Sequence, residues 1–414
     1  MSQQKSIRMN NSFKFVITLV VLGAVGFVAY AFMPSVTALK YDTHVAQVDK
    51  AGLAASELLG GDETTKEQEQ VPAPEKPTEE NVVVTHIETP KAVKGIYISS
   101  WVAGSPNFFA KLIKMVDTTE LNSVVIDVKD STGKLSFPMS DPEISKYDSA
   151  ERRISKPKTM VADLHAKGIY VIARVAVFQD PYMAKSKPEW AIKSKSTGTA
   201  WKDYKGLSFL DPSNEEVREY VVRIAKEAYA MGFDEINFDY IRFPSDGNMK
   251  DIAYPNEGGT LTRADIMKNF FSALHDDLKG TGIVTSADLF GLVTTATDDL
   301  GIGQVLEDAL PYFDFICPMT YPSHYAKGTY NIAEPAKHPY EILKTSMTKA
   351  VERAQAIGED PLKLRPWLQD FDLGATYTKD MVRAQITATY DSGLTSWLLW
   401  DAANEYTPSA LLAE

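Results

Sequence analysis

From Lys94 onward, short apolar stretches alternate with longer segments in which apolar residues recur every three to four positions. The short stretches are rich in Val, Ile and Phe and are nearly uninterrupted, which is typical of parallel strands buried on both faces. We predict eight strands: Gly95 to Ser99, Ser123 to Lys129, Tyr170 to Phe178, Glu235 to Arg242, Val284 to Leu289, Phe313 to Thr320, Leu364 to Asp370 and Ser396 to Asp401.

The segments between these strands have the 3.6-residue period of amphipathic helices. Ser213 and Glu216 form a predicted capping box before the apolar stripe at residues 217–228, and Thr262 and Asp265 form another. Eight strands alternating with helices over about 320 residues predict an α/β fold, a (β/α)8 TIM barrel. A doubly wound sheet is the alternative, but no glycine-rich phosphate turn follows the first strand.

The N-terminal region has the pattern of a membrane anchor. Lys5, Arg8 and Lys14 precede an uncharged apolar stretch from Phe15 to Met33, close to the roughly 20 residues that a transmembrane helix needs. Positive charge before this stretch and the acidic bulk after it place the bulk outside the cytoplasm. We predict an uncleaved, single-pass signal anchor in the cell membrane; cleavage near Val36-Thr37-Ala38, with secretion, is the alternative.

The composition changes abruptly between the anchor and the barrel. Residues 62–80 are rich in Glu, Thr, Pro and Gln and contain almost nothing apolar, so they cannot bury enough surface to offset their ordering entropy. We therefore predict a cytoplasmic stub and transmembrane anchor at residues 1–38, a disordered acidic linker at 39–92 and an extracytoplasmic barrel at 93–414.

The overall composition excludes several classes of function. The 414 residues carry a formal net charge of −12, which argues against a nucleic acid partner because phosphate binding requires clustered Lys and Arg. The single cysteine, Cys317, leaves no intrachain disulfide, and the six histidines lack HExxH or HxH spacing. We predict no metal and no cofactor.

The fourth predicted strand contains the strongest candidate for chemistry. In a parallel barrel, inward-facing residues at the C-terminal ends of the strands form the active-site mouth. The two-residue period places Asn237 and Asp239 on the inner face, and Ile236, Phe238 and Tyr240 on the outer face against helices. An acid retained inside an apolar strand has few structural roles, so we predict that Asp239 is functional.

Other strands carry polar or aromatic residues near the same level. Asp127 and Lys129 share a face of the second strand, and Asp288 ends the fifth. We predict substrate-binding roles for Asp127, Lys129, Arg174, Asn237, Arg242, Tyr321, Trp367, Trp400 and Asp401. Two alternatives stay open: Arg174 as a structural counter-ion of Asp127 or Asp239, and Asp401 as a cap or loop acceptor.

The predicted strand ends carry carboxylates, but the sequence shows no metal-ligand spacing, Ser-His pairing or phosphate loop. Glycoside hydrolysis is therefore the simplest reaction class. That reaction requires two carboxyl groups that flank the scissile bond. Aromatic residues at strand ends would provide stacking surfaces for sugar rings, although ordinary packing is the alternative.

Two sequence blocks resemble bacterial glycosyl hydrolase-like domains that were long catalogued as domains of unknown function. The blocks run from Leu210 to Tyr220 and from Gly232 to Pro244, the second containing Phe-Asp-Tyr-Ile-Arg-Phe-Pro. The stretches from Lys94 to Ile98 and from Pro318 to Pro322 fit the same pattern. The resemblance covers roughly residues 91–405, which is the whole predicted barrel.

The resemblance implies a TIM barrel related to the α-amylase-like hydrolases, whose strand-four aspartate is the nucleophile. By position this residue is Asp239, and the acid/base that commonly follows strand five is Asp288, where many relatives have Glu. We predict a hydrolase of a cell-envelope or extracellular polysaccharide that retains configuration, with carboxyl groups about 5–5.5 Å apart rather than the roughly 6.5–9.5 Å of inversion. A non-catalytic polysaccharide-binding barrel and, less strongly, an envelope scaffold with an exposed apolar patch are the alternatives.

Overall fold

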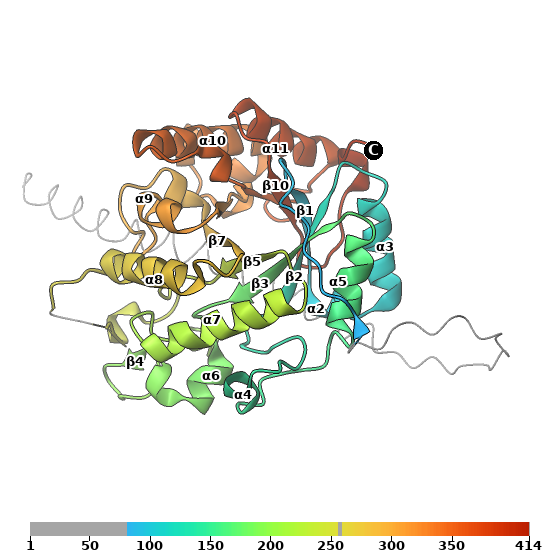
Figure 1. The fold of residues 1–414 in the computed structure, drawn as a ribbon. Coiled ribbons are helices and arrows are strands. Elements are labelled where there is room, and N and C mark those ends of the chain that lie inside the picture. The colour runs from blue at the N-terminus through green and yellow to red at the C-terminus, as the bar shows by residue number, and fades with distance from the viewer. Residues whose placement is uncertain (1–80, 256–258, 414) are drawn as a thin grey trace, which may run out of the picture.

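The computed structural model describes residues 81–255 and 259–413 and contains a closed barrel of parallel strands surrounded by helices (Figure 1). The barrel order is β1-β10-β9-β8-β7-β5-β3-β2, and the barrel closes where Lys94 of β1 pairs with Trp397 of β10. The strands are β1 (Lys94–Ile98), β2 (Ser123–Lys129), β3 (Tyr170–Ala176), β5 (Glu235–Asp239), β7 (Val284–Phe290), β8 (Phe315–Met319), β9 (Trp367–Gln369) and β10 (Trp397–Trp400). The predicted (β/α)8 barrel is confirmed, and closure excludes an open doubly wound sheet.

Helices connect the strands on the outside of the barrel, and a short antiparallel pair, β4 (Lys193–Ser194) and β6 (Ile252–Ala253), lies in the loops after β3 and β5. The capping box predicted at Thr262 and Asp265 is present at the start of α8. The helices are α2 (Ser100–Ala103), α3 (Pro106–Val116), α4 (Pro142–Ser145), α5 (Pro157–His165), α6 (Pro181–Ser186), α7 (Glu215–Ala230), α8 (Arg263–Leu278), α9 (Leu306–Ala309), α10 (Pro339–Ala356) and α11 (Lys379–Asp391).

Helix α7 begins differently from the prediction. Its N-cap is Asn214, whose Oδ1 accepts hydrogen bonds from the backbone N–H groups of Glu216 and Val217 at 2.9 and 3.4 Å. The Ser213 hydroxyl instead donates to Asp211 at 2.7 Å. The capping box predicted at Ser213 was therefore wrong, because the carboxylate of Asp211 occupies the serine hydroxyl and leaves Asn214 to cap the helix.

The two faces of β5 separate apolar from polar residues, as the period of two predicts. On the outer face, Phe238 is fully buried and its ring lies 6.3 Å from Phe313, which packs at 5.5 Å on Phe271 of α8. On the inner face, Glu235 forms a fully buried ion pair with Arg365 at 3.0 Å. Buried charge is costly unless it is paired. This ion pair fills the barrel interior near the start of β5, so the interior at the C-terminal end of the strand is left for the site.

The chain before β1 packs against the N-terminal face of the barrel. The backbone N–H of Ile87 donates to Asp234 Oδ1 at 2.8 Å, and the ring of His86 stacks on Tyr229 with centroids 3.8 Å apart. The end of the predicted linker therefore contacts the barrel. The predicted anchor and the rest of the linker lie outside the described residues; within residues 81–255 and 259–413, no helix combines the length and apolar character needed to cross a bilayer.

Candidate active site

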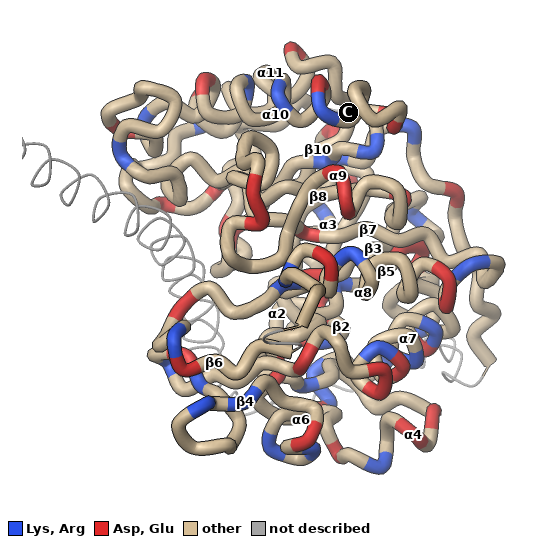
Figure 2. Tube along the Cα trace, turned by 90° about the vertical axis from the view of Figure 1, so that its left-hand side faces the viewer, with Lys and Arg blue, Asp and Glu red and all other residues tan. Residues whose placement is uncertain are grey.

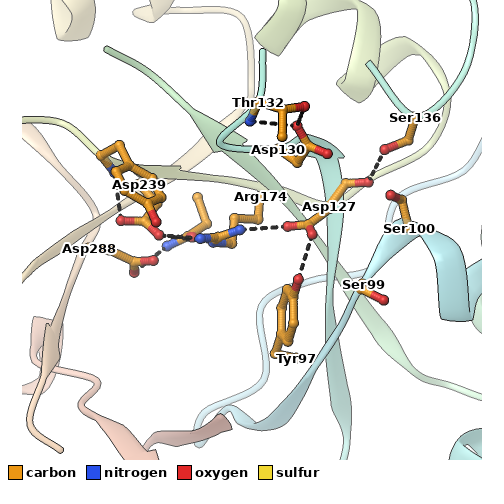
Figure 3. Close-up of polar contacts among 12 residues, drawn as sticks. Tyr97, Ser99, Ser100, Asp127, Asp130, Thr132, Ser136, Arg174, Asp239 and Asp288 are labelled. Carbon is orange, nitrogen blue, oxygen red and sulfur yellow. Dashed lines mark hydrogen bonds and ion pairs between the residues drawn. The ribbon is translucent and has the colours of Figure 1, made fainter. Parts of the chain in front are cut away.

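An arginine-centred network lies at the C-terminal ends of the strands. Figure 2 views the face that carries α2, β4 and β6, and acidic and basic residues lie among the strands at its centre. Figure 3 shows Arg174 of β3 between Asp239 on one side and Asp127 on the other. Its Nη1 donates to Asp127 Oδ1 at 2.7 Å, while Nε and Nη2 donate to Asp239 Oδ2 at 3.0 and 2.5 Å. The strand register explains the network, because Arg174 lies opposite Asp127 on β2 and Asn237 on β5.

Asp239 ends β5 and accepts hydrogen bonds at both carboxyl oxygens. Arg174 bonds Oδ2, and the backbone N–H of Tyr240 donates to Oδ1 at 2.6 Å. This set of donors, one of them a buried guanidinium, stabilises negative charge on the carboxylate. The side chain is buried but lines a cavity, so a ligand in that cavity would meet a carboxyl group held in place by Arg174 and the backbone.

The residue after Asp239 departs from strand geometry. Tyr240 has a φ of 49°, in the left-handed region that non-glycine residues rarely adopt. The strand therefore ends at Asp239, and the Tyr240 ring lies 6.0 Å from the Arg174 guanidinium and 5.5 Å from that of Arg242. The prediction that Tyr240 lies on the outer face against helices was wrong, because the turn breaks the alternation.

Asp288 of β7 is the second carboxyl group at the cavity. Its Oδ1 accepts hydrogen bonds from Asn237 Nδ2 at 2.8 Å and from Trp367 Nε1 at 2.7 Å. Burial raises the pKa of Asp288 well above its usual value, and the nearby charge of Asp239 raises it further. The Asn237 hydrogen bond, the charge of Arg174 and the Trp367 hydrogen bond oppose this rise. Asp288 is therefore suited to carry a proton beside Asp239, whose carboxyl group is paired with Arg174.

Asp127 supports the other side of Arg174. Tyr97 of β1 donates to Asp127 Oδ2 at 2.6 Å, and the Tyr97 ring stacks on Trp400 at 4.0 Å. Burial raises the pKa of Asp127, while the charge of Arg174 and the Tyr97 hydrogen bond lower it. The aromatic pair and the carboxylate together hold the guanidinium, which also lies 5.0 Å from the Trp400 ring.

A small cavity separates the two carboxyl groups from an aromatic wall. Its volume is about 10 Å³, enough for about one water molecule, so a sugar ring requires the wall to move. Tyr321, His324 and Phe371 contact one another edge to face, with centroids 5.3 to 5.9 Å apart. The cavity is lined by Arg174, Asp239, Asp288, Met319, Tyr321, His324, Phe371 and Trp400.

Lys129 does not join the site. The alternation predicts that Asp127 and Lys129 share a face of β2. The β2–β3 register shifts between them, so they lie on different faces. The Lys129 ammonium is fully buried, 2.8 Å from Asp180 and 2.6 Å from the carbonyl oxygen of Ala176. The prediction of a shared face was wrong, and the lysine instead joins β2 to the loop after β3.

Two other predicted binding residues lie outside the cavity lining. The Arg242 guanidinium packs over Phe290 at 4.7 Å and donates to the Phe243 carbonyl at 3.0 Å. Asp401 accepts a hydrogen bond from the Glu405 backbone N–H at 3.1 Å, which is the loop-acceptor alternative. Asn237 and Trp367 reach the site indirectly, through their hydrogen bonds to Asp288.

Sequence reasoning did not single out Tyr97, His324 or Phe371 for the site. Tyr97 lies in an apolar strand and could be found only as an aromatic residue near a strand end. His324 and Phe371 belong to the connections after β8 and β9, where no periodic pattern indicates direction. Among the described residues, no three His, Cys, Asp or Glu side chains are grouped so as to hold a metal ion.

Comparison with known proteins identifies the family. A family model described as "Putative glycosyl hydrolase domain" (DUF4015) matches residues 95–406, and the chain belongs to this family. A hypothetical protein from Ruminiclostridium thermocellum ATCC 27405 is 32% identical, with 50% of this chain and 98% of that chain covered and a TM-score of 0.43. A search of curated proteins gave no match.

Two solved glycoside hydrolase domains are also similar to the chain. The PgaB (BpsB) domain from Bordetella bronchiseptica is 14% identical, with 75% of this chain and 94% of that chain covered and a TM-score of 0.56. The PelA domain from Pseudomonas aeruginosa is 12% identical, with 79% and 98% covered and a TM-score of 0.42. The similarity to the PgaB domain shows a shared fold.

Proposed function

We propose that the chain is a glycoside hydrolase in which Asp239 is the nucleophile and Asp288 the acid/base. The observation that carries the proposal is that both carboxyl groups line one cavity in contrasting environments. Arg174 and a backbone N–H stabilise charge on Asp239, whereas burial raises the pKa of Asp288. Glycoside hydrolysis requires this division between a charged and a protonated carboxyl group.

The strand register supports a retaining mechanism. Asn237 of β5 pairs with Ser286 of β7, so Asp239 and Asp288, each two residues further on, occupy corresponding positions on adjacent strands. Adjacent strand backbones lie about 4.8 Å apart, so the two side chains start from neighbouring positions, and we propose that their carboxyl groups reach the roughly 5–5.5 Å separation of retaining enzymes. Asp239 would attack the anomeric carbon while Asp288 protonates the leaving oxygen. Asp288 would then take a proton from the water that releases the sugar.

The predicted anchor supports a location and a substrate. With Phe15 to Met33 in the membrane and the barrel outside the cytoplasm, the reachable polymers are those of the cell envelope and the extracellular space. We therefore propose a membrane-anchored hydrolase of such a polysaccharide.

The test compares release of reducing ends by the wild type and by Asp239→Asn, across a panel of envelope polysaccharides. We expect the substitution to lower kcat by about 10³-fold or more, because it removes the nucleophile while keeping the side-chain shape. Asp380→Asn, an exposed carboxylate on α11, is the matched control and should retain wild-type activity. Equal activity of Asp239→Asn and wild type would contradict the assignment.

The two alternatives predict different outcomes of the same experiment. A non-catalytic binding barrel would bind polysaccharide without release, although Asp288 at the cavity favours catalysis. An envelope scaffold would use an apolar surface away from the strand ends. A cavity of about 530 Å³ between α3 and α5, lined partly by Phe109, Ile113 and Met160, is such a surface. Absence of both release and binding would favour the scaffold.

A further inference from the structure

A second hollow adjoins the catalytic cavity on the other side of Arg174. It has a volume of about 50 Å³ and is formed by the chain after β1 and after β2. Arg174 lines both spaces, so a ligand that extends from Asp239 past the guanidinium enters this hollow. Figure 3 shows Asp127, Asp130 and Thr132 away from Asp288, beyond Arg174.

An exposed tryptophan forms one wall of the hollow. Trp101 of α2 is 42% exposed, whereas the other tryptophans of the barrel are buried. The Arg153 guanidinium lies 4.7 Å above the ring, and Arg153 is itself held by Asp130 Oδ2 at 2.5 Å and Ser100 Oγ at 3.1 Å. Arg153 therefore holds the indole ring in place before any ligand binds, and the exposed surface of the ring is available to an apolar partner.

The remaining walls are polar, and their guanidinium groups are paired with carboxylates. Asp127 is paired with Arg174, and Asp130 is paired with Arg153. Arg174 also pairs with Asp239, and Arg153 also pairs with Glu151, so both guanidinium groups are already engaged by carboxylates and the hollow does not favour an anionic ligand. Hydroxyl-bearing residues, including Thr132, line the same space. This chemistry suits a ligand with an apolar face, many hydroxyl groups and no negative charge, as in a neutral sugar.

We propose that this hollow is a second sugar subsite, which binds a neutral pyranose residue next to the one at Asp239 and Asp288. The proposal rests on the proposed hydrolase function and extends it: the substrate is a chain of neutral sugars that crosses Arg174. The apolar C–H face of the pyranose stacks on Trp101, and its hydroxyl groups meet the polar walls. Longer oligosaccharides therefore bind more tightly than single sugars.

The experiment measures binding of neutral cello-, malto- and chito-oligosaccharides of three to six residues by calorimetry, in full-length protein carrying Asp239→Asn. We expect Trp101→Ala to weaken binding of the best member about tenfold or more, and Trp101→Phe to restore most of the affinity because it keeps a stacking face. Leu362→Ala, an exposed apolar residue in the turn before β9, is the matched control and should leave binding unchanged.

Equal affinity in Trp101→Ala and its parent would overturn the subsite, as would failure of every neutral oligosaccharide to bind the parent. Hydrolysis by the wild type combined with Trp101-independent binding would overturn the subsite alone. Trp101-dependent binding without hydrolysis by the wild type would overturn the proposed enzyme and leave the subsite supported. Circular dichroism of Trp101→Ala and Trp101→Phe separates loss of binding from loss of fold.

Discussion

At the scale of single residues, the site depends on how two aspartates of the same chemical type are made different. Asp239 accepts hydrogen bonds from a guanidinium and a backbone N–H, whereas Asp288 accepts them from the neutral donors Asn237 and Trp367 inside the barrel. Burial then raises the pKa of Asp288 well above its ordinary value. The difference lies in the neighbours, because the side chains themselves are identical.

The Trp367 hydrogen bond provides a test of this account. It stabilises the charged form of Asp288, so Trp367→Phe should raise the pKa of Asp288 further. Because the proposed reaction uses protonated Asp288, the high-pH limb of kcat should move upward by about one pH unit. A hydrogen bond to a charged group contributes about 1.5 kcal/mol, and one pKa unit corresponds to about 1.4 kcal/mol.

The measurement is the pH profile of kcat. Trp190→Phe is a matched control, since Trp190 is also buried but donates to Glu216 of α7, remote from the cavity. Trp190→Phe should leave the high-pH limb of the kcat profile at the wild-type pH. A limb that stays fixed or moves to lower pH in Trp367→Phe would contradict the role of Asp288.

At the scale of elements, strand and helix identity follow local pattern, but the exact ends do not. The alternation along β5 correctly places Asn237 and Asp239 inward, and fails one residue later at the left-handed turn of Tyr240. The alternation along β2 fails at the register shift before Lys129. Strand ends are set by neighbouring chain segments, which a two-residue period cannot describe.

The N-cap of α7 is one such element end that can be tested by mutation. Asn214→Ala should lower the free energy of unfolding by about 1 kcal/mol, because the asparagine oxygen accepts two backbone N–H groups at the helix start. Ser213→Ala should cost much less, since the hydroxyl bonds only to Asp211 and lies on the surface. Urea unfolding of both variants compares their losses in the free energy of unfolding. A larger loss for Ser213→Ala would indicate that Ser213, and not Asn214, caps the helix.

At the scale of the whole molecule, the barrel keeps several carboxyl groups away from water. Burial raises the pKa of Asp370 to about 6 and that of Asp401 to about 7. Both lie at strand ends beside the loop to the C-terminus, where Thr407 donates to Asp370 and Glu405 to Asp401. Between about pH 4 and 7, the folded state therefore binds protons that the unfolded state releases, and these groups make stability fall as pH rises.

Asp401→Asn tests the contribution of one such group. The contribution of Asp401 to stability is fully present below about pH 4 and is lost as the pH rises to about 7. Asparagine does not titrate, so the fall in Tm from pH 5 to pH 7.5 should be smaller in Asp401→Asn than in the wild type. Asp380→Asn, on the surface of α11, should keep the wild-type difference. An unchanged difference in Asp401→Asn would contradict the raised pKa.

The sequence alone determined the alternation of eight strands and helices, and with it the inward direction of Asn237 and Asp239, because these properties depend on periods of 2 and 3.6 residues. It also indicated Asp127, Arg174 and Asp288 as strand-end residues. The tertiary structure alone decided that Arg174 joins Asp127 to Asp239, because β2, β3 and β5 become neighbours only when the sheet forms. The same holds for burial of Asp288, the aromatic wall and the position of Trp101 beside Arg153, each of which depends on segments far apart in the chain.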